Sequence, residues 1–334
     1  MITNRAFAVS SKKLRFTFLG LLLILIAGLR PIGIDRDSLS YVSFLHISLS
    51  DANFINKEPA FWIINELNRI LFGGNEHTFF LIFAIIGITL KFFAIKKLSL
   101  SPIFSVFTYV CLYFILHEMT QIRAGVATAI FLLAIQDIYN RNLKSFLLKT
   151  ILAMMFHYSA IIMLPVYFLN PYKINFKFFF FLPIFGVFLM FIGINVITIL
   201  NSFLSILPDF LANKAELYIL LLDDGKFNEI NVFNFYYGSL LLIYYIMLLY
   251  HNYFKSKYDV LLLKLFGLML FFFYFLSSFP VLAFRVSEFF GVVLIILIPH
   301  FAIIFKEKTI AKIPLSLWLT VYLVVIMISR NLNI

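Results

Sequence analysis

The residues of this chain that could do chemistry are polar and ionisable side chains that lie beside or inside long apolar runs. A charged side chain at membrane depth costs at least about 2.5–3.5 kcal/mol, so several of them grouped together indicate a wet functional cavity. In chain order, the group comprises Arg30, Arg36, Asp37, Tyr41, Glu58, Glu118, Arg123, His157, Arg285 and Glu288.

The arginines of this group suit one kind of ligand in particular. A guanidinium stays protonated and donates hydrogen bonds in a planar fork, which matches the geometry of a phosphate or diphosphate. Arg123 and Arg285 stand at the beginning of apolar runs, whereas Arg30 and Arg36 follow the first such run. Arginines placed beside outer-leaflet lipid favour an anionic, lipid-linked substrate.

Each of these side chains also has an ordinary structural explanation. Arg30 and Arg285 could extend from the ends of membrane spans into the interface. Arg123 could form a structural ion pair with Glu118, and His157 could be a buried histidine whose nitrogens are hydrogen-bonded.

The polar side chains of the first outer segment could simply begin helices. Asp37 could cap a following helix. Glu58 precedes Pro59, a residue favoured in the first turn of a helix. Tyrosine pairs further along the chain are typical of an interfacial aromatic belt; they are Tyr236–Tyr237 and Tyr244–Tyr245.

Composition determines what kind of scaffold positions these residues. Hydrophobic residues make up 63% of the 334 residues, and the mean hydropathy is +1.00, far above the range of soluble domains. Repeated apolar runs of about 17–25 residues match the ~30 Å hydrocarbon core of a bilayer. The predicted fold class is therefore all-α, a polytopic integral membrane protein whose single transmembrane domain covers residues 1–334.

Charge and cysteine content exclude several other classes. The net charge of +11 comes mostly from Lys and Arg in short loops beside apolar runs, which is typical of cytoplasmic anchoring and argues against a nucleic-acid partner. The single Cys111 excludes an intramolecular disulfide framework. The pair Asp35 and Asp37 is a weak cation signal, and nucleotide-binding loops are absent, so no metal or other cofactor is expected.

The apolar runs predict about nine full transmembrane helices. The basic residues Arg5, Lys12, Lys13 and Arg15 precede the first run and place the N-terminus in the cytoplasm, with the C-terminus outside. Two longer outer segments, 30–77 and 201–232, connect these spans, and an amphipathic helix at 58–72 is expected to lie in the interface. The predicted spans are 16–29, 78–95, 103–116, 122–138, 178–200, 233–254, 260–279, 286–305 and 313–329.

The apolar run 146–169 carries a polar triplet, His157, Tyr158 and Ser159, at its centre. If the run crosses the membrane, eight later lysines face or border the outside, against the positive-inside rule; if it folds back, they move inside. This favours a re-entrant hairpin, although a kinked full span remains an alternative. Two legs of about eleven residues would reach about halfway across the bilayer.

Five stretches, in this order, resemble the EpsG-type family of Wzy-like bacterial polysaccharide polymerases. They are RPIGIDRDSLSY at 30–41, EPAFWIINELNRIL at 58–71, QIRAGVATAIFLLA at 121–134, FHYSAIIMLPVYF at 156–168 and RVSEFF at 285–290. Ala124 stands where relatives often have glutamine, so no role is carried over to that position.

The resemblance implies a metal-independent, inverting glycosyltransferase of the bacterial inner membrane whose active site faces the periplasm. It would transfer a growing glycan from undecaprenyl diphosphate to a new lipid-linked repeat unit, producing O-antigen, capsule or exopolysaccharide. Membrane lipid and a chain-length-regulating co-polymerase are the other expected partners.

Within this reaction, residue roles follow from the need for a base and for cations that stabilise the departing diphosphate. Arg123 and Arg285 are assigned to the diphosphate, with Arg36 and Arg30 secondary. Asp37, His157 and Glu58 are the candidate bases, and Tyr41, Glu118 and Glu288 are further site residues. Alternative functions are a lipid-linked oligosaccharide flippase or exporter, an O-antigen ligase, and a lipid-phosphosugar-dependent glycosyltransferase.

Overall fold

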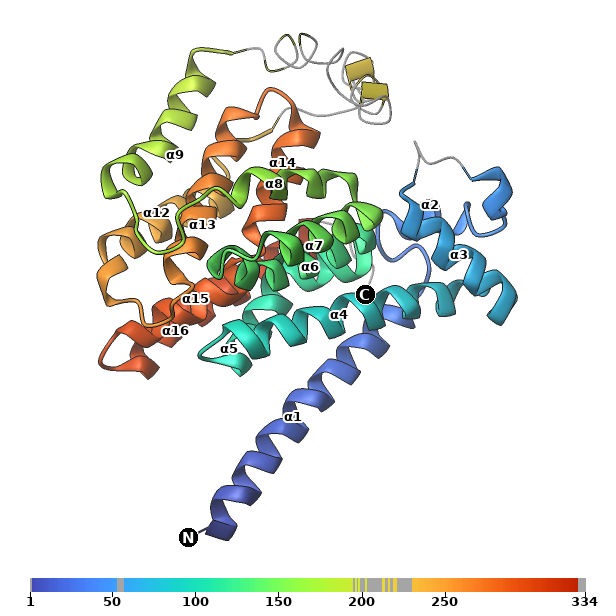
Figure 1. Ribbon diagram of the computed structural model, residues 1–334, viewed down its shortest axis with the longest axis horizontal. Coiled ribbons are helices and arrows are strands. Elements are labelled where there is room, and N and C mark those ends of the chain that lie inside the picture. The colour runs from blue at the N-terminus through green and yellow to red at the C-terminus, as the bar shows by residue number, and fades with distance from the viewer. Residues whose placement is uncertain are drawn as a thin grey trace.

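The computed structural model describes residues 2–52, 57–194 and 230–329, together with isolated positions between 195 and 229. Throughout this described part the regular structure is helical (Figure 1). The elements up to the middle of the chain are α1 (Ile2–Gly28), α2 (Ser38–Val42), η1 (Leu49–Asp51), α3 (Pro59–Phe72), α4 (Glu76–Leu98), α5 (Pro102–Tyr109), η2 (Val110–Thr120), α6 (Ile122–Tyr139), α7 (Leu143–Phe156), η3 (Tyr158–Ile162) and α8 (Met163–Val166). They are followed by α9 (Phe176–Phe191), α12 (Phe235–Leu249), η5 (His251–Tyr253), α13 (Asp259–Phe275), α14 (Pro280–Gly291), α15 (Leu294–Ile304) and α16 (Lys308–Ser329).

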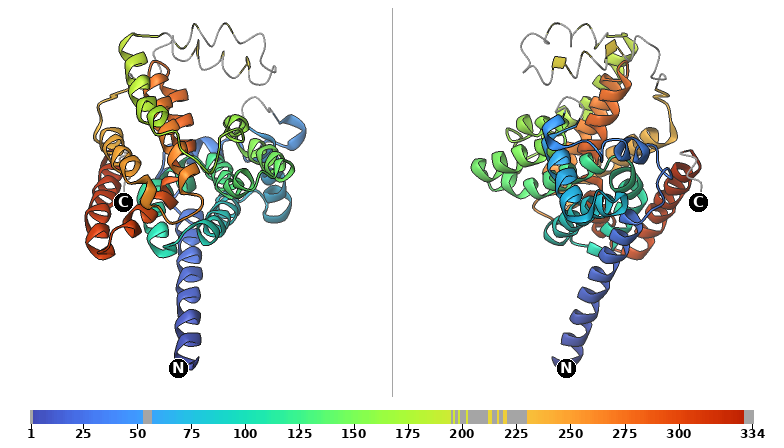
Figure 2. Two further views of the ribbon diagram at one scale, coloured as in Figure 1. Left: turned by 60° about the vertical axis from the view of Figure 1, so that its left-hand side comes forward. Right: turned by 90° about the vertical axis from the view of Figure 1, so that its right-hand side faces the viewer.

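Helices α6 and α15 form the centre of the molecule. Every residue of α15 from Leu294 to Ala302 is buried except for a small part of Phe301, and most of α6 is buried between α4, α7 and η2. By contrast, α16 is largely exposed, and α1 extends away from the body of the molecule (Figure 2). In the part of α1 from Leu14 on, and in α16, the exposed side chains with described burial are mainly apolar, as expected when lipid is the solvent.

Several helices are long and apolar enough to cross a membrane. Four satisfy this by length and composition: α4, the continuous α5–η2 rod, α6 and most of α16. The pair α14 and α15, bent by 49° at its break, would be a fifth. Among the described residues, the second half of α1, α9 and α12 are apolar helices that are shorter than a full span. An all-helical membrane protein is thus confirmed, whereas the predicted count of about nine spans stays a prediction.

Local sequence explains where these helices begin. Proline occupies the first turn of α3, α5 and α14, where its missing N–H is not needed. An asparagine side chain accepts an N–H from the residue three positions on at the start of α4, α7, α9 and α12, as in an N-cap. Gly73, with a φ of 65°, ends α3 in the left-handed conformation that glycine adopts most easily.

The turn before α6 differs from the sequence-based expectation. The helix of α5 does not stop at 116 but continues as the π-helix η2 to Thr120, and only Gln121 separates it from α6. His117 and Glu118, which fall in the outer connection between the predicted spans 103–116 and 122–138, are therefore buried within a helix. The physical reason is that Glu118 has a buried partner inside the bundle and does not need water.

Residues 143–169 fold back on themselves. Helix α7 ends at Phe156, His157 is extended, and the chain returns through η3 and α8. The guanidinium of Arg141, just before α7, donates to the carbonyl of Tyr167 and, at 2.7 Å, to that of Leu169. The two ends of the segment thus lie side by side, and His157 lies at the turn. A re-entrant placement in the membrane stays a prediction.

Other expectations have mixed outcomes. The amphipathic helix predicted at 58–72 forms as α3; Glu66 and Arg69 pair on one face of it, and Leu67 and Leu71 are exposed. The prediction that the tyrosine pairs form an interfacial aromatic belt was wrong for one tyrosine of each pair. Tyr237 and Tyr244 are buried, because their hydroxyls have interior partners, Ser287 Oγ and the Phe179 carbonyl, each at 2.7 Å. The second outer segment, 201–232, lies mostly outside the described residues.

Candidate functional site

The turn between α1 and α2 is organised by Asp35. Its Oδ2 accepts a hydrogen bond of 2.9 Å from Arg30 Nε, and its Oδ1 accepts the N–H groups of Asp37 and Ser38 at 3.1 and 2.9 Å. Arg30 also donates at 2.6 Å to the carbonyls of Ala27 and Met119. Because Asp35 supplies the cap of this turn, the Asp37 side chain makes no capping bond and lines a cavity instead.

Glu58 occupies the centre of a second set of contacts. It precedes α3, but its fully buried carboxylate does not cap that helix. One oxygen forms an ion pair with Arg123 Nη1. The other lies 3.2 Å from His157 Nδ1 and accepts the N–H of Tyr158 at 3.3 Å. Glu58 therefore joins three elements that are far apart in the sequence, namely α3, the start of α6 and the turn after α7.

A third set of contacts fixes the η2–α6 turn, where Arg123 begins its helix. Lys91 of α4, fully buried, donates to Glu118 Oε1 at 2.5 Å and to the Gly125 carbonyl at 2.7 Å. Glycine is required on both sides of this contact. A Cβ at Gly87 would lie 2.6 Å from Glu118 Oε2, and one at Gly125 would overlap the carbonyl of His117. The ion pair between Arg123 and Glu118, which was the alternative structural explanation for Arg123, does not form, because each residue has another partner.

These three sets of contacts surround a cavity of about 100 Å³, enough for several waters or a small anionic group. Its lining comes from α2 and the turn before it, from the η2–α6 turn, from the turn after α7, and from α14. The residues are Asp37, Tyr41, Gln121, Arg123, Ala124, His157 and Arg285. The cavity thus combines two guanidinium groups, one carboxylate and one imidazole.

The charges around the cavity act on Asp37. Burial, and next the nearby carboxylate of Asp35, raise the pKa of Asp37 above its ordinary value, while Lys57, Arg123 and Arg285 act in the opposite direction. Lys57 is itself nearly buried, with its ammonium 4.7 Å from the ring centre of Phe44 and 5.0 Å from that of Tyr41. A carboxyl with a raised pKa is a better proton acceptor than an ordinary aspartate.

Helix α14 brings a second carboxylate to the edge of the cavity. Arg285 lines the cavity, and Glu288, three residues later, accepts a hydrogen bond of 3.2 Å from Gln121 Nε2. Arg123 also lies 5.7 Å from the ring centre of Tyr41, in a cation–π arrangement. The arginine from the η2–α6 turn and the arginine from α14 thus reach the same space from opposite parts of the chain.

The structure brings together most of the residues singled out by sequence. Asp37, Tyr41, Arg123, His157 and Arg285 line one cavity; Glu58 lies behind it and Glu288 beside it. Three do not reach it: Arg36 is exposed, Arg30 is bonded to Asp35, and Glu118 pairs with Lys91.

Sequence reasoning did not assign Lys91, Lys57 or Gln121 to the site. Gln121 lines the cavity, Lys57 acts on Asp37, and Lys91 holds the η2–α6 turn. The one that had a clear signal is Lys91, a charged residue within the predicted span 78–95, because such residues are rare unless they have a partner. Among the described residues, no three His, Cys, Asp or Glu side chains come together in a way that could hold a metal ion.

The fold and the cavity define a class: a polytopic helical membrane protein with arginines and carboxylates gathered in a cavity formed by its helix ends and connecting segments. The model of the EpsG family matches residues 13–333, nearly the whole chain. The chain belongs to the EpsG family, the family of Wzy-like polysaccharide polymerases. No curated protein and no solved structure matches it.

Proposed function

We propose that this protein polymerises lipid-linked oligosaccharide repeat units at the periplasmic face of the bacterial inner membrane. The observation that carries this proposal is the cavity in which Arg123 and Arg285 meet Asp37 and His157. Family membership supports polysaccharide polymerisation in a membrane. The guanidinium pair supports the narrower choice of an undecaprenyl diphosphate-linked donor, because a planar fork matches phosphate oxygens.

In the proposed reaction, Asp37 removes the proton from a hydroxyl at the non-reducing end of the incoming repeat unit. The hydroxyl oxygen attacks the anomeric carbon of the growing glycan from the face opposite the diphosphate, so the configuration inverts. The bond between that carbon and the diphosphate oxygen breaks, and the lipid diphosphate departs with the electron pair. Arg123 and Arg285 stabilise the charge that develops on it.

Asp37 is preferred to the other candidate bases on geometry. Glu58 is fully buried and engaged by Arg123, by His157 and by the backbone of Tyr158, so we assign it to positioning Arg123. His157 lines the cavity but directs Nδ1 at Glu58. Asp37 is half-buried, lines the cavity and has a raised pKa. The exposed Arg36 and the internally bonded Arg30 are left out of the diphosphate set.

The topology belongs to the same proposal: about nine spans and one hairpin, 146–169, with the N-terminus in the cytoplasm. On this topology the start of α6, the turn after α7 and the start of α14 all open toward the periplasm. The single transmembrane domain covers residues 1–334, and the outer segment 30–77 provides Asp37 and Glu58.

Gene deletion followed by gel analysis of the surface polysaccharide tests the function. A polymerase predicts that the deletion strain presents a single repeat unit on the final acceptor. Loss of all product would instead indicate a flippase or an earlier transferase, and normal polymer would refute the proposal.

Complementation then tests the residues. Arg123→Ala and Arg285→Ala should leave single repeat units at normal enzyme levels, and Arg→Lys at either position should remain impaired, because an ammonium cannot replace the bidentate fork. Arg69→Ala, which changes an exposed arginine on α3, is the matched control and should restore polymer. Full-length polymer from Arg123→Ala or Arg285→Ala would overturn the diphosphate assignment.

A further inference from the structure

A second cavity lies beside the first and has a different chemical character. Its volume is about 260 Å³, close to the lower end of small-molecule sites. Tyrosines from three separate elements line it, and the polar groups among them are an amide and a carboxylate. These residues are Tyr113, Asn234, Tyr236, Tyr237, Glu288 and Tyr322. We call this the tyrosine cavity.

The aromatic walls of this cavity are held in place. The rings of Tyr236 and Tyr322 stack with centres 4.0 Å apart, and Trp318 stacks 6.2 Å from Tyr322. Tyr237 is stacked on Phe273, and its hydroxyl lies 2.7 Å from Ser287 Oγ. These contacts fix the tyrosine rings before any ligand arrives.

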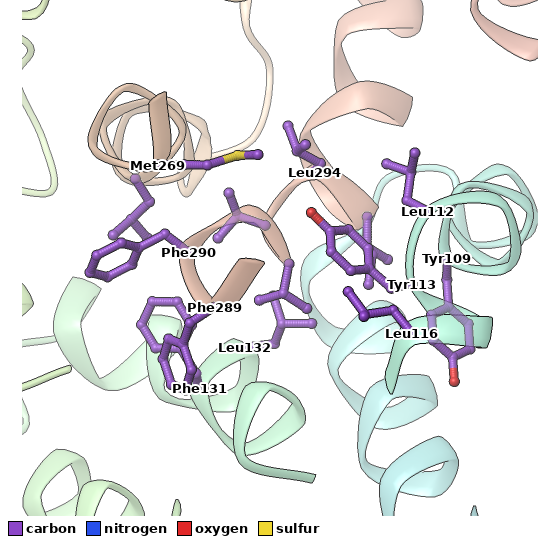
Figure 3. Close-up of a cluster of buried hydrophobic side chains, with 14 of the residues drawn as sticks. Tyr109, Leu112, Tyr113, Leu116, Phe131, Leu132, Met269, Phe289, Phe290 and Leu294 are labelled. Carbon is purple, nitrogen blue, oxygen red and sulfur yellow. The ribbon is translucent and has the colours of Figure 1, made fainter. Parts of the chain in front are cut away.

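Tyr113 enters the cavity wall from η2. In Figure 3 it projects from η2 between Leu132 of α6 and Leu294 of α15, in the apolar cluster that joins η2 to α14. A Cβ at Gly291 would lie 2.5 Å from the Tyr113 hydroxyl, so glycine at this position leaves the room that the ring needs. The position of this tyrosine is therefore set by close packing as well as by its own helix.

The tyrosine cavity shares a wall with the first cavity, which Arg123 and Arg285 line and which we call the arginine-lined cavity. Glu288 lines the former, Gln121 lines the latter, and the two side chains are joined by the 3.2 Å hydrogen bond. Arg285 lies three residues before Glu288 on α14. A ligand in the tyrosine cavity would thus lie next to the proposed site of diphosphate departure.

The lining residues indicate what such a ligand would be. Stacked aromatic rings present flat apolar faces, whereas a carboxylate and an amide are hydrogen-bonding partners for hydroxyl groups. No lysine or arginine lines the tyrosine cavity in the described part of the chain, which disfavours a phosphate there. A neutral sugar ring has both an apolar face of C–H groups and a rim of hydroxyls.

We infer that the tyrosine cavity binds one uncharged sugar ring of the lipid-linked oligosaccharide, stacked on the Tyr236–Tyr322 pair with its hydroxyls toward Glu288 and Asn234. This inference rests on the proposed function, whose substrate it places. It assigns Tyr236 and Tyr322 as binding residues and Glu288 as the group that orients the ring toward the arginine-lined cavity.

Trp318 provides a direct test, because the chain has two tryptophans and the other, Trp62, is buried in α3. In a purified Trp62→Phe background, Trp318 fluorescence is titrated with the repeat-unit oligosaccharide released from its lipid. Saturable binding is expected. Tyr322→Ala should weaken it about 2- to 12-fold, the loss of one aromatic stacking contact, and Tyr322→Phe should retain it because the ring remains.

Two controls separate this inference from the proposed function. Phe181→Ala removes an exposed aromatic side chain of α9 and should leave the titration unchanged. Binding of undecaprenyl diphosphate should survive Tyr322→Ala. If the oligosaccharide binds but no polymer forms from the lipid-linked unit, the proposed function fails and the inference stands. Absence of saturable binding, or equal affinity in Tyr322→Ala, would overturn the inference.

Discussion

The buried carboxylate of Glu58 offers the sharpest test of how the site is held together. Glu58→Gln keeps the size of the side chain and removes its charge. The side chain of Glu58 has no exposed surface, and that of Arg123 is 14% exposed, so water cannot replace the lost partner effectively. Removing one member of a buried ion pair costs about 3–5 kcal/mol, because the remaining charge is left uncompensated.

That cost translates into a measurable loss of function. At about 1.4 kcal/mol per factor of ten, it lowers the population of correctly placed Arg123 roughly 10²-fold or more. The assay is polymer length on a gel, in deletion cells that carry Glu58→Gln at matched enzyme levels in the membrane. We expect single repeat units in place of polymer. In a double-mutant cycle followed by thermal melting, the variant that carries both Glu58→Gln and Arg123→Gln should be less destabilised than the sum of the two single variants.

The control uses the same substitution on the neighbouring helix. Glu66→Gln breaks the surface pair with Arg69, which water and salt already screen, and should leave polymer length unchanged. If Glu58→Gln cells make polymer of normal length, Glu58 does not position Arg123. Additive melting losses in the cycle would likewise contradict a direct interaction.

Three further predictions follow from other parts of the structure. The raised pKa of Asp37 means that folding favours its protonated form, and this contribution to stability is lost as pH rises through the folded pKa. At neutral pH Asp37→Asn should therefore melt no lower than the wild type, although it should abolish polymerisation because the base is gone. The wild-type rate should fall on acidification at a pH above the ordinary aspartate range. A lower melting temperature for Asp37→Asn would argue against a half-buried carboxylate that destabilises the fold when charged. Lys91→Met and Glu118→Gln should each lower the yield of folded protein, because either leaves a buried charge alone, and the double variant should recover part of it; equal losses in all three would refute the pairing. Lys255 is one of the eight later lysines that the hairpin topology places in the cytoplasm, and Cys111 is buried. Lys255→Cys therefore adds an exposed thiol that should resist impermeant reagents in intact spheroplasts; labelling there would refute the hairpin topology.

Particular residues show how far the sequence leads for the fold. The apolar runs predict α4 and α6 within a few residues, because a bilayer-spanning helix must be apolar along its whole length. The end of the helix before α6 was missed, because a polar stretch such as the one around His117 and Glu118 normally marks a turn. The buried ammonium of Lys91 makes that stretch stable inside the bundle instead.

The sequence by itself determined the class of this protein and its most reactive positions. Arginines at the edges of apolar runs are costly, so Arg123 and Arg285 stood out without any structure. Only the tertiary structure decided which partner each charge has, because pairing depends on helices that are far apart in the chain. Arg30 joined Asp35 and Glu118 joined Lys91, whereas Glu58 reached Arg123 and His157. Likewise, the tyrosines around Tyr237 are a bilayer-interface pattern in sequence, and tertiary packing alone turned them inward to form a cavity.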